Sequence, residues 1–269
     1  MKAGCKALFS DIDGTALRCD HTMSGAVADA FRSCMDGGLA VVLASSRSPQ
    51  GMMPIIEENG LEGVWISAYG GGLLLDGEGR KVAEHGFGRN LALAIEGYVE
   101  ERFGNTAAAG IYSAEHWYVK DRKDPRIARE EGIVKTSSQE GGAAALRKDE
   151  TVGKLLFICN PEATINIRDA LRERFPKLHV STSSDILIEV NAAGISKATA
   201  IADACAALGI SPVETAAIGD AANDLPMLEA AGTAFAMGNA VPEVKRMADF
   251  ICATNCEDGV AEACAKLLA

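Results

Sequence analysis

The chain has 269 residues, of which 48% are hydrophobic, and its formal net charge is −11. This apolar content is sufficient for a packed core and excludes a disordered chain, and the acidic balance argues against nucleic acid or an anionic membrane as a partner. No apolar stretch reaches the roughly 18 to 20 residues that span a bilayer, and no signal peptide is recognisable. We therefore expect a soluble, cytoplasmic protein; the sequence leaves its oligomeric state, monomer or weak dimer, open.

The eight cysteines allow two readings. Their even number is compatible with disulfides, but the chain is not short, and the closest pair, Cys252 and Cys256, has neither a redox nor a zinc spacing. Cys159 and Cys205 lie in apolar stretches, as buried free cysteines do. We expect free thiols in a reducing cytosol.

Short apolar runs alternate with helix-like segments at both ends of the chain. In the first eighty residues we predict strands at 6–11, 39–46 and 64–72 and helices at 24–38 and 48–60. Ser24 and Ser48 are suited to begin these helices, and Gly37 and Gly60 to end them. In the last eighty residues we predict strands at 215–220, 233–239 and 248–254 and helices at 194–209, 223–232 and from about 258. Strands that are apolar throughout are typical of a parallel sheet covered on both faces, so we expect both ends to form one sheet.

The middle of the chain has a different pattern. We predict strands at 106–112, 115–120, 152–159, 178–182 and 186–190 and helices at 91–104 and 161–175. Adjacent strand pairs indicate an antiparallel sheet with helices packed on it. The predicted fold class is α/β: a Rossmann-like, doubly wound parallel-sheet core, residues 1–82 and 189–269, with a smaller α/β domain, residues 83–188, inserted into it.

Two carboxylates end the first predicted strand, in the stretch DIDGT that begins at Asp11. Asp11 and Asp13 alternate with Ile12, so both carboxylates point to the same side of the chain. Ligands bind beyond the carboxyl ends of the strands in doubly wound sheets. Carboxylates this close repel each other unless one is protonated or both share a cation, and a hard divalent ion such as Mg²⁺ satisfies this need.

Polar residues also follow two other predicted strands. Ser45 and Ser46 follow the second strand, before a helix start, where a hydroxyl and backbone N–H groups can bind an anion. Asp220 ends a later strand, and Asn223 and Asp224 stand one turn further on. Carboxylates from distant parts of the sequence would thus converge at one edge of the sheet. None of the four histidines lies in these segments, which disfavours zinc.

Lys197 supplies a positive charge at the start of the predicted helix 194–209, where it opposes the helix dipole. With an anion nearby this position is favourable, and the helix N-terminus and the ammonium together favour a phosphoryl group. Taken singly, each position has an ordinary explanation: Lys197 as a surface lysine, Asp224 and Ser45 as helix caps, and DGT as a turn. Because all of them fall at predicted strand or helix ends, the set favours a phosphate site.

These segments resemble a known family in order and spacing. DIDGT at 11–15, LASSR at 43–47, GISK at 194–197 and GDAAND at 219–224 resemble the four motifs of the haloacid dehalogenase (HAD) superfamily. The insertion of more than a hundred residues between the second and third motifs is similar to the α/β cap of its Cof-type (type IIB cap) sugar-phosphatase branch. The resemblance covers the whole chain. It implies a hydrolase that cleaves phosphomonoesters with Mg²⁺ through an aspartyl-phosphate intermediate.

The resemblance also implies a role for each site residue. Asp11 is expected to be the nucleophile that attacks phosphorus, and Asp13 the general acid for the leaving group and then the base for water. The other implied roles are phosphate binding by Ile12, Ser45, Ser46, Lys197 and Asn223, Mg²⁺ binding by Asp11, the main-chain carbonyl of Asp13 and Asp220, and support of the site by Asp224.

Four residues depart from the family pattern: Ser46, Ala198 and Ala221 replace glycines, and Tyr69 stands where asparagine is common. None removes a catalytic group, but they leave the substrate range open. We expect a phosphatase whose partner is a small phosphorylated metabolite, a sugar phosphate or a phosphorylated cofactor, with no nucleic-acid or membrane partner. A phosphomutase with the same aspartates and a non-catalytic metabolite-binding protein are the alternatives.

Overall fold

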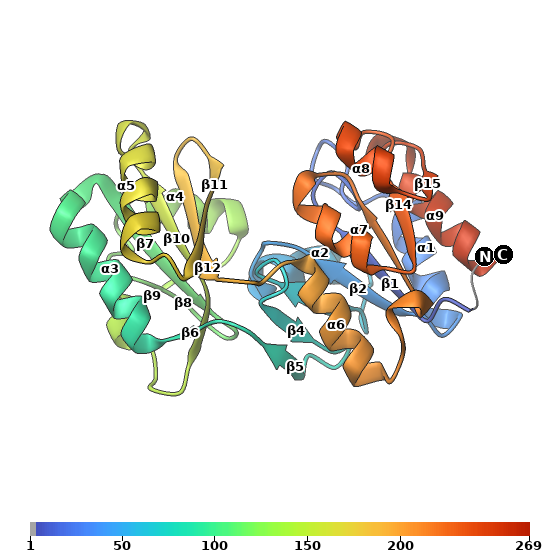
Figure 1. Ribbon diagram of the computed structural model, residues 1–269, viewed down its shortest axis with the longest axis horizontal. Coiled ribbons are helices and arrows are strands. Elements are labelled where there is room, and N and C mark those ends of the chain that lie inside the picture. The colour runs from blue at the N-terminus through green and yellow to red at the C-terminus, as the bar shows by residue number, and fades with distance from the viewer. Residues whose placement is uncertain (1–3) are drawn as a thin grey trace. The chain divides into compact units, whose positions relative to one another are not determined.

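The computed structural model describes residues 4–269. The chain divides into two compact units (Figure 1). The core unit holds the described residues up to Arg47, Met52–Ala83 and Ser196–Ala269, and the cap unit holds Ser48–Gly51 and Glu84–Ile195.

The cap unit extends further along the chain than the sequence predicts. The predicted insertion ends at residue 188, but Glu189 belongs to β12 (Leu187–Ala192), which pairs with two other strands of the cap sheet. The pairing of β12 with β11 continues to Asn191 and Ala192. Because this strand crosses the predicted boundary, the cap unit extends to Ile195.

The core unit is built on an eight-stranded sheet with the order β15-β14-β13-β1-β2-β3-β4-β5. Its strands are β1 (Ala7–Asp11), β2 (Ala40–Ala44), β3 (Trp65–Ala68), β4 (Leu73–Leu75), β5 (Lys81–Glu84), β13 (Thr215–Gly219), β14 (Thr233–Ala236) and β15 (Phe250–Ile251). β1 lies between β2 and β13 and is parallel to both, with Phe9 opposite Val42 and Ala217. Both ends of the chain contribute to one sheet, as predicted. Its strand pairs from β15 to β3 are parallel, whereas β4 is antiparallel to β3.

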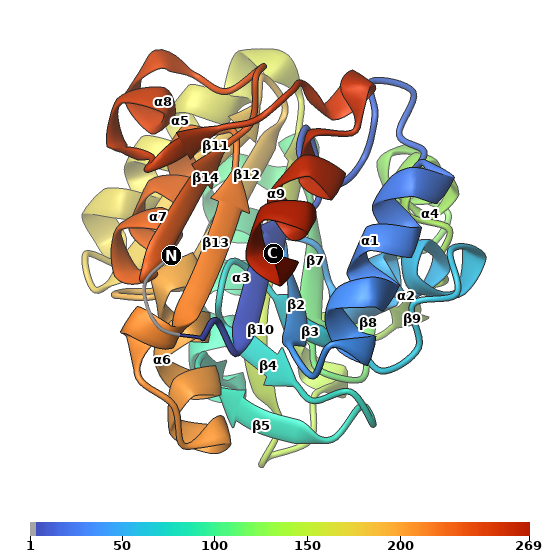
Figure 2. The ribbon, with the colours of Figure 1, turned by 90° about the vertical axis from the view of Figure 1, so that its right-hand side faces the viewer.

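Helices cover both faces of this sheet, as expected for strands that are apolar throughout. Figure 2 shows α1 (Gly25–Asp36) and α9 (Gly259–Leu268) on one face, and α6 (Lys197–Leu208), α7 (Leu225–Ala230) and α8 (Pro242–Met247) on the other; α2 (Pro49–Glu58) connects β2 to β3. The predicted caps are present: Ser24 Oγ accepts from Val27 N at 3.1 Å and Ser48 Oγ from Gly51 N at 3.2 Å.

The cap unit has its own mixed sheet, with the order β11-β12-β10-β7-β8-β9 and β6 paired to β10. Its other elements are β6 (Phe87–Gly88), α3 (Arg89–Phe103), β7 (Ala107–Ser113), β8 (Trp117–Val119), α4 (Pro125–Val134), β9 (Gln139–Glu140), β10 (Thr151–Cys159), α5 (Pro161–Arg174) and β11 (Leu178–Ser184). All its strand pairs but β8–β9 are antiparallel. Helices α3 and α5 are neighbours (Figure 1). Their residues Ile95 and Ile167 are buried in one apolar cluster with Phe157 of β10. The predicted α/β fold class is confirmed.

Two findings bear on the expectations drawn from composition. Within residues 4–269, no helix combines the length and apolar character needed to cross a membrane. All eight cysteines lie in this range and are free thiols, and Cys159 and Cys205 are buried as predicted. The cysteines therefore form no disulfide framework in this structure.

Candidate active site

The candidate site lies at the carboxyl edge of the core sheet. Asp11 is the last residue of β1 and is paired with Ala44, the last residue of β2. Ser45 follows directly, and Asp220 follows β13, the other neighbour of β1. Because the three strands are parallel, their carboxyl ends bring these side chains to the same edge.

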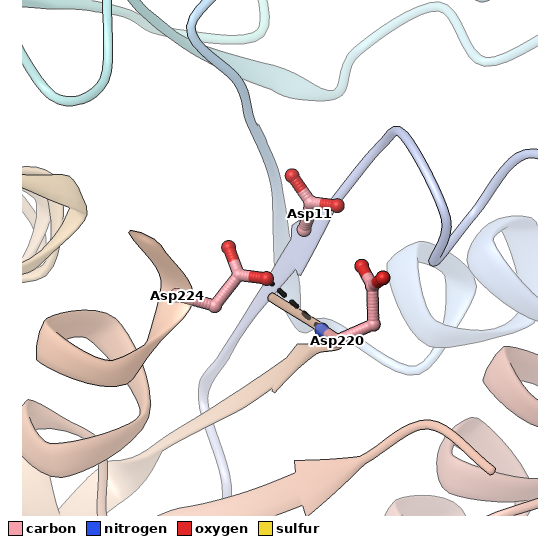
Figure 3. A group of neighbouring side chains, drawn as sticks. All are labelled: Asp11, Asp220 and Asp224. Carbon is pink, nitrogen blue, oxygen red and sulfur yellow. Dashed lines mark hydrogen bonds between the residues drawn. The ribbon is translucent and has the colours of Figure 1, made fainter. Parts of the chain in front are cut away.

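Three carboxylates gather at this edge. Oxygen atoms of Asp11, Asp220 and Asp224 lie within 4.8 Å of one another, and Figure 3 shows the three side chains projecting from different segments toward one region. Asp224 Oδ2 accepts a hydrogen bond from the backbone N–H of Asp220 at 2.9 Å (Figure 3). It also accepts one from the backbone N–H of Ala221 at 3.0 Å. Asp224 therefore fixes the turn that presents Asp220.

Two glycines make room for this arrangement. A Cβ on Gly219 would lie 2.6 Å from Asp224 Cβ, and one on Gly14 would lie 2.5 Å from Asp220 Oδ2. Gly14 also has a φ of 83°, a conformation that side chains disfavour. The glycine of DIDGT thus lets Asp220 approach the turn that follows Asp13.

Lys197 is the cation of the cluster. Its Nζ donates to Asp11 Oδ1 and to Asp224 Oδ1, the latter at 2.5 Å. The residue is 2% exposed, which excludes the explanation as a surface lysine. Lys197 is the first residue of α6, and a capping box between Ser196 and Thr199 fixes the start of that helix.

The electrostatics of the cluster reflect a shortage of positive charge. Burial, together with the Asp224 and Asp220 carboxylates, raises the pKa of Asp11 to about 7 against the opposing effect of Lys197. Burial and then the Asp224 carboxylate also raise the pKa of Asp220. Burial disfavours the Lys197 ammonium, but Asp11 and Asp224 raise its pKa above the ordinary value. Three neighbouring carboxylates thus surround a single ammonium, which is bonded to two of them, Asp11 and Asp224.

This donor set fits a magnesium ion. The cluster offers carboxylate oxygens, which are the ligands of Mg²⁺, and its excess negative charge matches a divalent cation. Asp220 is oriented by Thr15 Oγ1, which donates to its Oδ1 at 2.9 Å, and by Asn239 Nδ2, which lies 3.5 Å from its Oδ2. Asp11 and Asp220 could hold the ion, with Asp224 also within reach of it. The Asp13 carbonyl as a ligand stays a prediction.

Asp13 lies in a different environment from Asp11. Its side chain is 45% exposed and forms a two-point ion pair with Arg47, from Nε to Oδ2 at 2.9 Å and from Nη2 to Oδ1 at 2.7 Å. This hydrogen-bonded pair raises the pKa of Arg47. The planar guanidinium fixes both position and orientation of the carboxylate. Two acids two residues apart are therefore distinguished by burial and by partner.

Four of the predicted phosphate-binding residues lie in segments that follow strands of the core sheet, and they differ in solvent exposure. Ile12 is fully buried, and its carbonyl accepts from Leu17 N at 2.9 Å. Ser45 is buried, and its Oγ accepts from Arg47 N at 3.2 Å. Ser46 and Asn223 are exposed. Their contacts with a phosphate stay a prediction.

Three residues of the site were not assigned a role from the sequence: Thr15, Arg47 and Asn239. Asn239 Nδ2 donates to the Gly14 carbonyl at 2.8 Å and thereby joins the segment after β14 to the turn after β1. A usable signal was present, because Asn239 ends the predicted strand 233–239 as Asp220 ends the predicted strand 215–220. Applying the search for polar residues after strands to every strand would have found it.

Comparison with known proteins identifies the family. The sequence model of the haloacid dehalogenase-like hydrolase family matches residues 8–264. The chain belongs to this family. Among the curated members of similar sequence are a putative phosphatase of Haemophilus influenzae, 29% identical over 95% of each chain, and the putative phosphatase YkrA of Bacillus subtilis, 30% identical over 97% of each. The predicted family and the predicted enzyme class, a phosphatase, are confirmed.

Solved structures of the family agree with the fold. A haloacid dehalogenase-like hydrolase from Bacteroides thetaiotaomicron superposes with a TM-score of 0.88 at 28% identity, covering 98% of this chain and 99% of its own. The subclass IIB sugar phosphatase BT4131 has a TM-score of 0.76 at 21% identity and covers 97% of this chain and 98% of its own. This second likeness supports the fold alone.

One departure from the family pattern has a visible backbone context. Tyr69 has a φ of 56°, in the left-handed region that asparagine tolerates better than other side chains. Its N–H donates to the Arg47 carbonyl at 3.0 Å, and the next N–H, of Gly70, donates to the Ser45 carbonyl at 2.8 Å. The backbone conformation at this position therefore explains why asparagine is usual there. Tyr69 adopts the same conformation, and its N–H binds the segment that follows β2.

Proposed function

We propose that the protein is a magnesium-dependent phosphatase that hydrolyses a phosphomonoester of a small metabolite, a sugar phosphate or a phosphorylated cofactor, through an aspartyl phosphate on Asp11. The observation that carries this proposal is the contrast between two acids at the end of one strand. Asp11 is buried beside Lys197, whereas Asp13 is half-exposed and held by Arg47. Lys197, and Mg²⁺ when bound, would favour the ionised carboxylate that Asp11 needs for attack, and Arg47 holds Asp13 two residues further along for proton transfer.

The first half of the reaction uses both acids. An oxygen of Asp11 attacks phosphorus, and the bond from phosphorus to the substrate oxygen breaks. Asp13, protonated at this stage, gives its proton to the leaving alkoxide. The phosphoryl oxygens are held by Lys197, the Ser45 hydroxyl, the Ser46 and Ile12 backbone and Asn223. Mg²⁺, if bound by Asp11, Asp220 and the Asp13 carbonyl, would offset the charge of the phosphoryl group.

The second half returns the enzyme to its starting state. The Asp13 carboxylate takes a proton from a water molecule, whose oxygen attacks the phosphorus of the aspartyl phosphate. The bond between phosphorus and the Asp11 oxygen breaks, and inorganic phosphate leaves. Asp11 is then a free carboxylate and Asp13 is protonated, as both were before the reaction. Arg47 holds the Asp13 side chain in position.

Hydrolysis of p-nitrophenyl phosphate, measured with and without Mg²⁺, tests the proposal. We expect chelation of divalent ions to abolish hydrolysis and added Mg²⁺ to restore it. Asp220→Asn is expected to raise the Mg²⁺ concentration for half-maximal activity by about tenfold or more, whereas Asp29→Asn, in an exposed pair on α1, should not change it. Full activity after chelation would contradict the proposed metal dependence.

Binding of the metal can be followed without turnover. Because Mg²⁺ would bind the folded protein between carboxylates that repel one another, added Mg²⁺ is expected to raise the melting temperature of the native protein. Asp220→Asn should reduce this shift. An equal shift in both proteins would contradict binding at this cluster.

Arg47→Lys tests the positioning of Asp13. An ammonium cannot reproduce the two parallel hydrogen bonds of the guanidinium, so we expect kcat to fall on the order of tenfold to a hundredfold. The Mg²⁺ requirement should stay unchanged, because Arg47 pairs with the Asp13 carboxylate and not with the acidic cluster. Arg32→Lys on α1 is the matched control. An unchanged kcat in Arg47→Lys would show that the ion pair is dispensable.

A further inference from the structure

Two exposed thiols meet on the core unit, away from the carboxylates of the site. Cys19 lies in the segment between β1 and α1, and Cys256 in the short turn before α9. Both are exposed, and their thiol groups share a hydrogen bond. This contact is the main cause that raises the pKa of Cys19. Residues from near opposite ends of the chain are therefore in direct contact through two oxidisable sulfur atoms.

Three contacts hold the two segments together around the thiols. Asn255 Nδ2 donates to the Leu17 carbonyl at 2.8 Å, next to the thiol pair. Arg18 Nη2 donates to Asp258 Oδ1 at 3.0 Å, and Ser24 also hydrogen-bonds to the Asp258 carboxylate. Because these contacts lie on both sides of Cys19, the fold holds the segments that carry the two thiols next to each other.

A second pair of neighbouring thiols provides an internal contrast. Cys34 of α1 hydrogen-bonds with Cys264 of α9, but these residues are 0% and 1% exposed. A soluble oxidant cannot reach them in the folded protein, whereas it can reach Cys19 and Cys256. Exposure thus separates a packed thiol pair from one that a soluble oxidant can reach.

We propose that Cys19 and Cys256 are a modification site, at which a disulfide oxidant such as oxidised glutathione forms a reversible intramolecular disulfide. One thiolate attacks the oxidant's disulfide and releases one glutathione thiolate. The second protein thiolate then attacks the mixed disulfide and releases the other. The two protons lost by the cysteines go to the two glutathione thiolates, so two protein thiols are oxidised while one glutathione disulfide is reduced to two thiols.

The bridge would act on the segment that carries the site. Asn255, next to Cys256, donates its N–H to Asn239 Oδ1 at 2.9 Å, and Asn239 donates to the Gly14 carbonyl. A covalent link between residues 19 and 256 would therefore fasten the segment after Asp13 at a second place. We expect slower amide hydrogen exchange over residues 12–24 in the oxidised protein. Because the bridge closes a very long loop, we also expect a melting temperature raised by roughly 5 °C.

Peptide mapping of the full-length protein after treatment with oxidised glutathione tests the proposal. Trypsin cleaves after Arg18, so the bridge would join the peptide that begins at Cys19 to the peptide that holds Cys256. This linked peptide is expected to form in the native protein and in Cys5→Ser, to be absent from Cys19→Ser and Cys256→Ser, and to disappear on reduction. The result does not depend on the proposed hydrolysis.

Three outcomes would overturn the proposal. The first is protein that keeps both thiols free, or carries only glutathione, after prolonged treatment. The second is a Cys34–Cys264 link in place of the expected one. The third is a link between two protein molecules, seen as a dimer under non-reducing conditions. A bridge that forms but lowers the melting temperature would contradict the inference that the fold already holds the thiols in place.

Discussion

Asp11→Asn is expected to lower phosphatase turnover on the order of 10⁴-fold or more, because a neutral amide cannot serve as the attacking oxygen. The fold should be kept. Asparagine has nearly the size of aspartate, and its neutral side chain removes one of the three carboxylates that repel one another in the cluster. Lys197 retains its bond to Asp224. Turnover of p-nitrophenyl phosphate and thermal unfolding, measured on the same preparation, check both parts.

The control for this variant is Asp29→Asn, which changes charge equally at an exposed position on α1. It should keep the turnover of the native protein. Asp11→Asn with native turnover would refute the nucleophile assignment. Loss of turnover together with loss of the folded state would not count in its favour, so the melting temperature must be measured first.

Asp13→Asn is expected to separate the two halves of the reaction. General acid–base catalysis by one side chain contributes on the order of 10²- to 10⁴-fold, so turnover of a sugar phosphate, whose leaving alkoxide needs a proton, should fall by that factor. Nitrophenolate leaves without protonation. The variant should therefore release about one nitrophenolate per enzyme in a rapid burst and then continue slowly, because attack of water on the aspartyl phosphate lacks its base.

The burst makes this prediction specific, because it separates formation of the aspartyl phosphate from its hydrolysis. A merely structural role for Asp13 would slow both substrates alike and give no burst. Arg47→Lys serves as the comparison, because it leaves the carboxylate present but less well held. Equal slowing of both substrates in Asp13→Asn, without a burst, would contradict the acid–base assignment.

The sequence predicts the core of the fold because each central strand is a short apolar run that stops at a polar residue. All five residues of β1 are buried, and the apolar run stops at Asp11, where the sheet edge begins. The same pattern holds for β13, which ends one residue before Asp220. Local patterns of this kind suffice to place Asp11, Asp220 and Lys197 at one edge, provided that the strands are parallel.

What the sequence did not predict depends on contacts between turns. The pairing of Arg47 with Asp13 requires the exact course of the segments after β1 and β2, which no periodicity records. The hydrogen bonds of Asn239 likewise join two loops from opposite ends of the chain. The cap unit ends after the predicted residue 188 because β12 continues through the polar residues Glu189 and Asn191. Pairing with β11, which the apolar pattern does not record, keeps these residues in the strand.

The central claim, a phosphoryl group carried by Asp11, can be tested most directly by trapping it. Asp13→Asn would be mixed with p-nitrophenyl phosphate and Mg²⁺, quenched in acid during the first turnover, and mapped by peptide mass spectrometry. We predict a phosphoryl group on Asp11 in this variant and none in Asp11→Asn combined with Asp13→Asn. A phosphoryl group on another residue, or release of phosphate with no phosphorylated peptide at any time, would contradict the account.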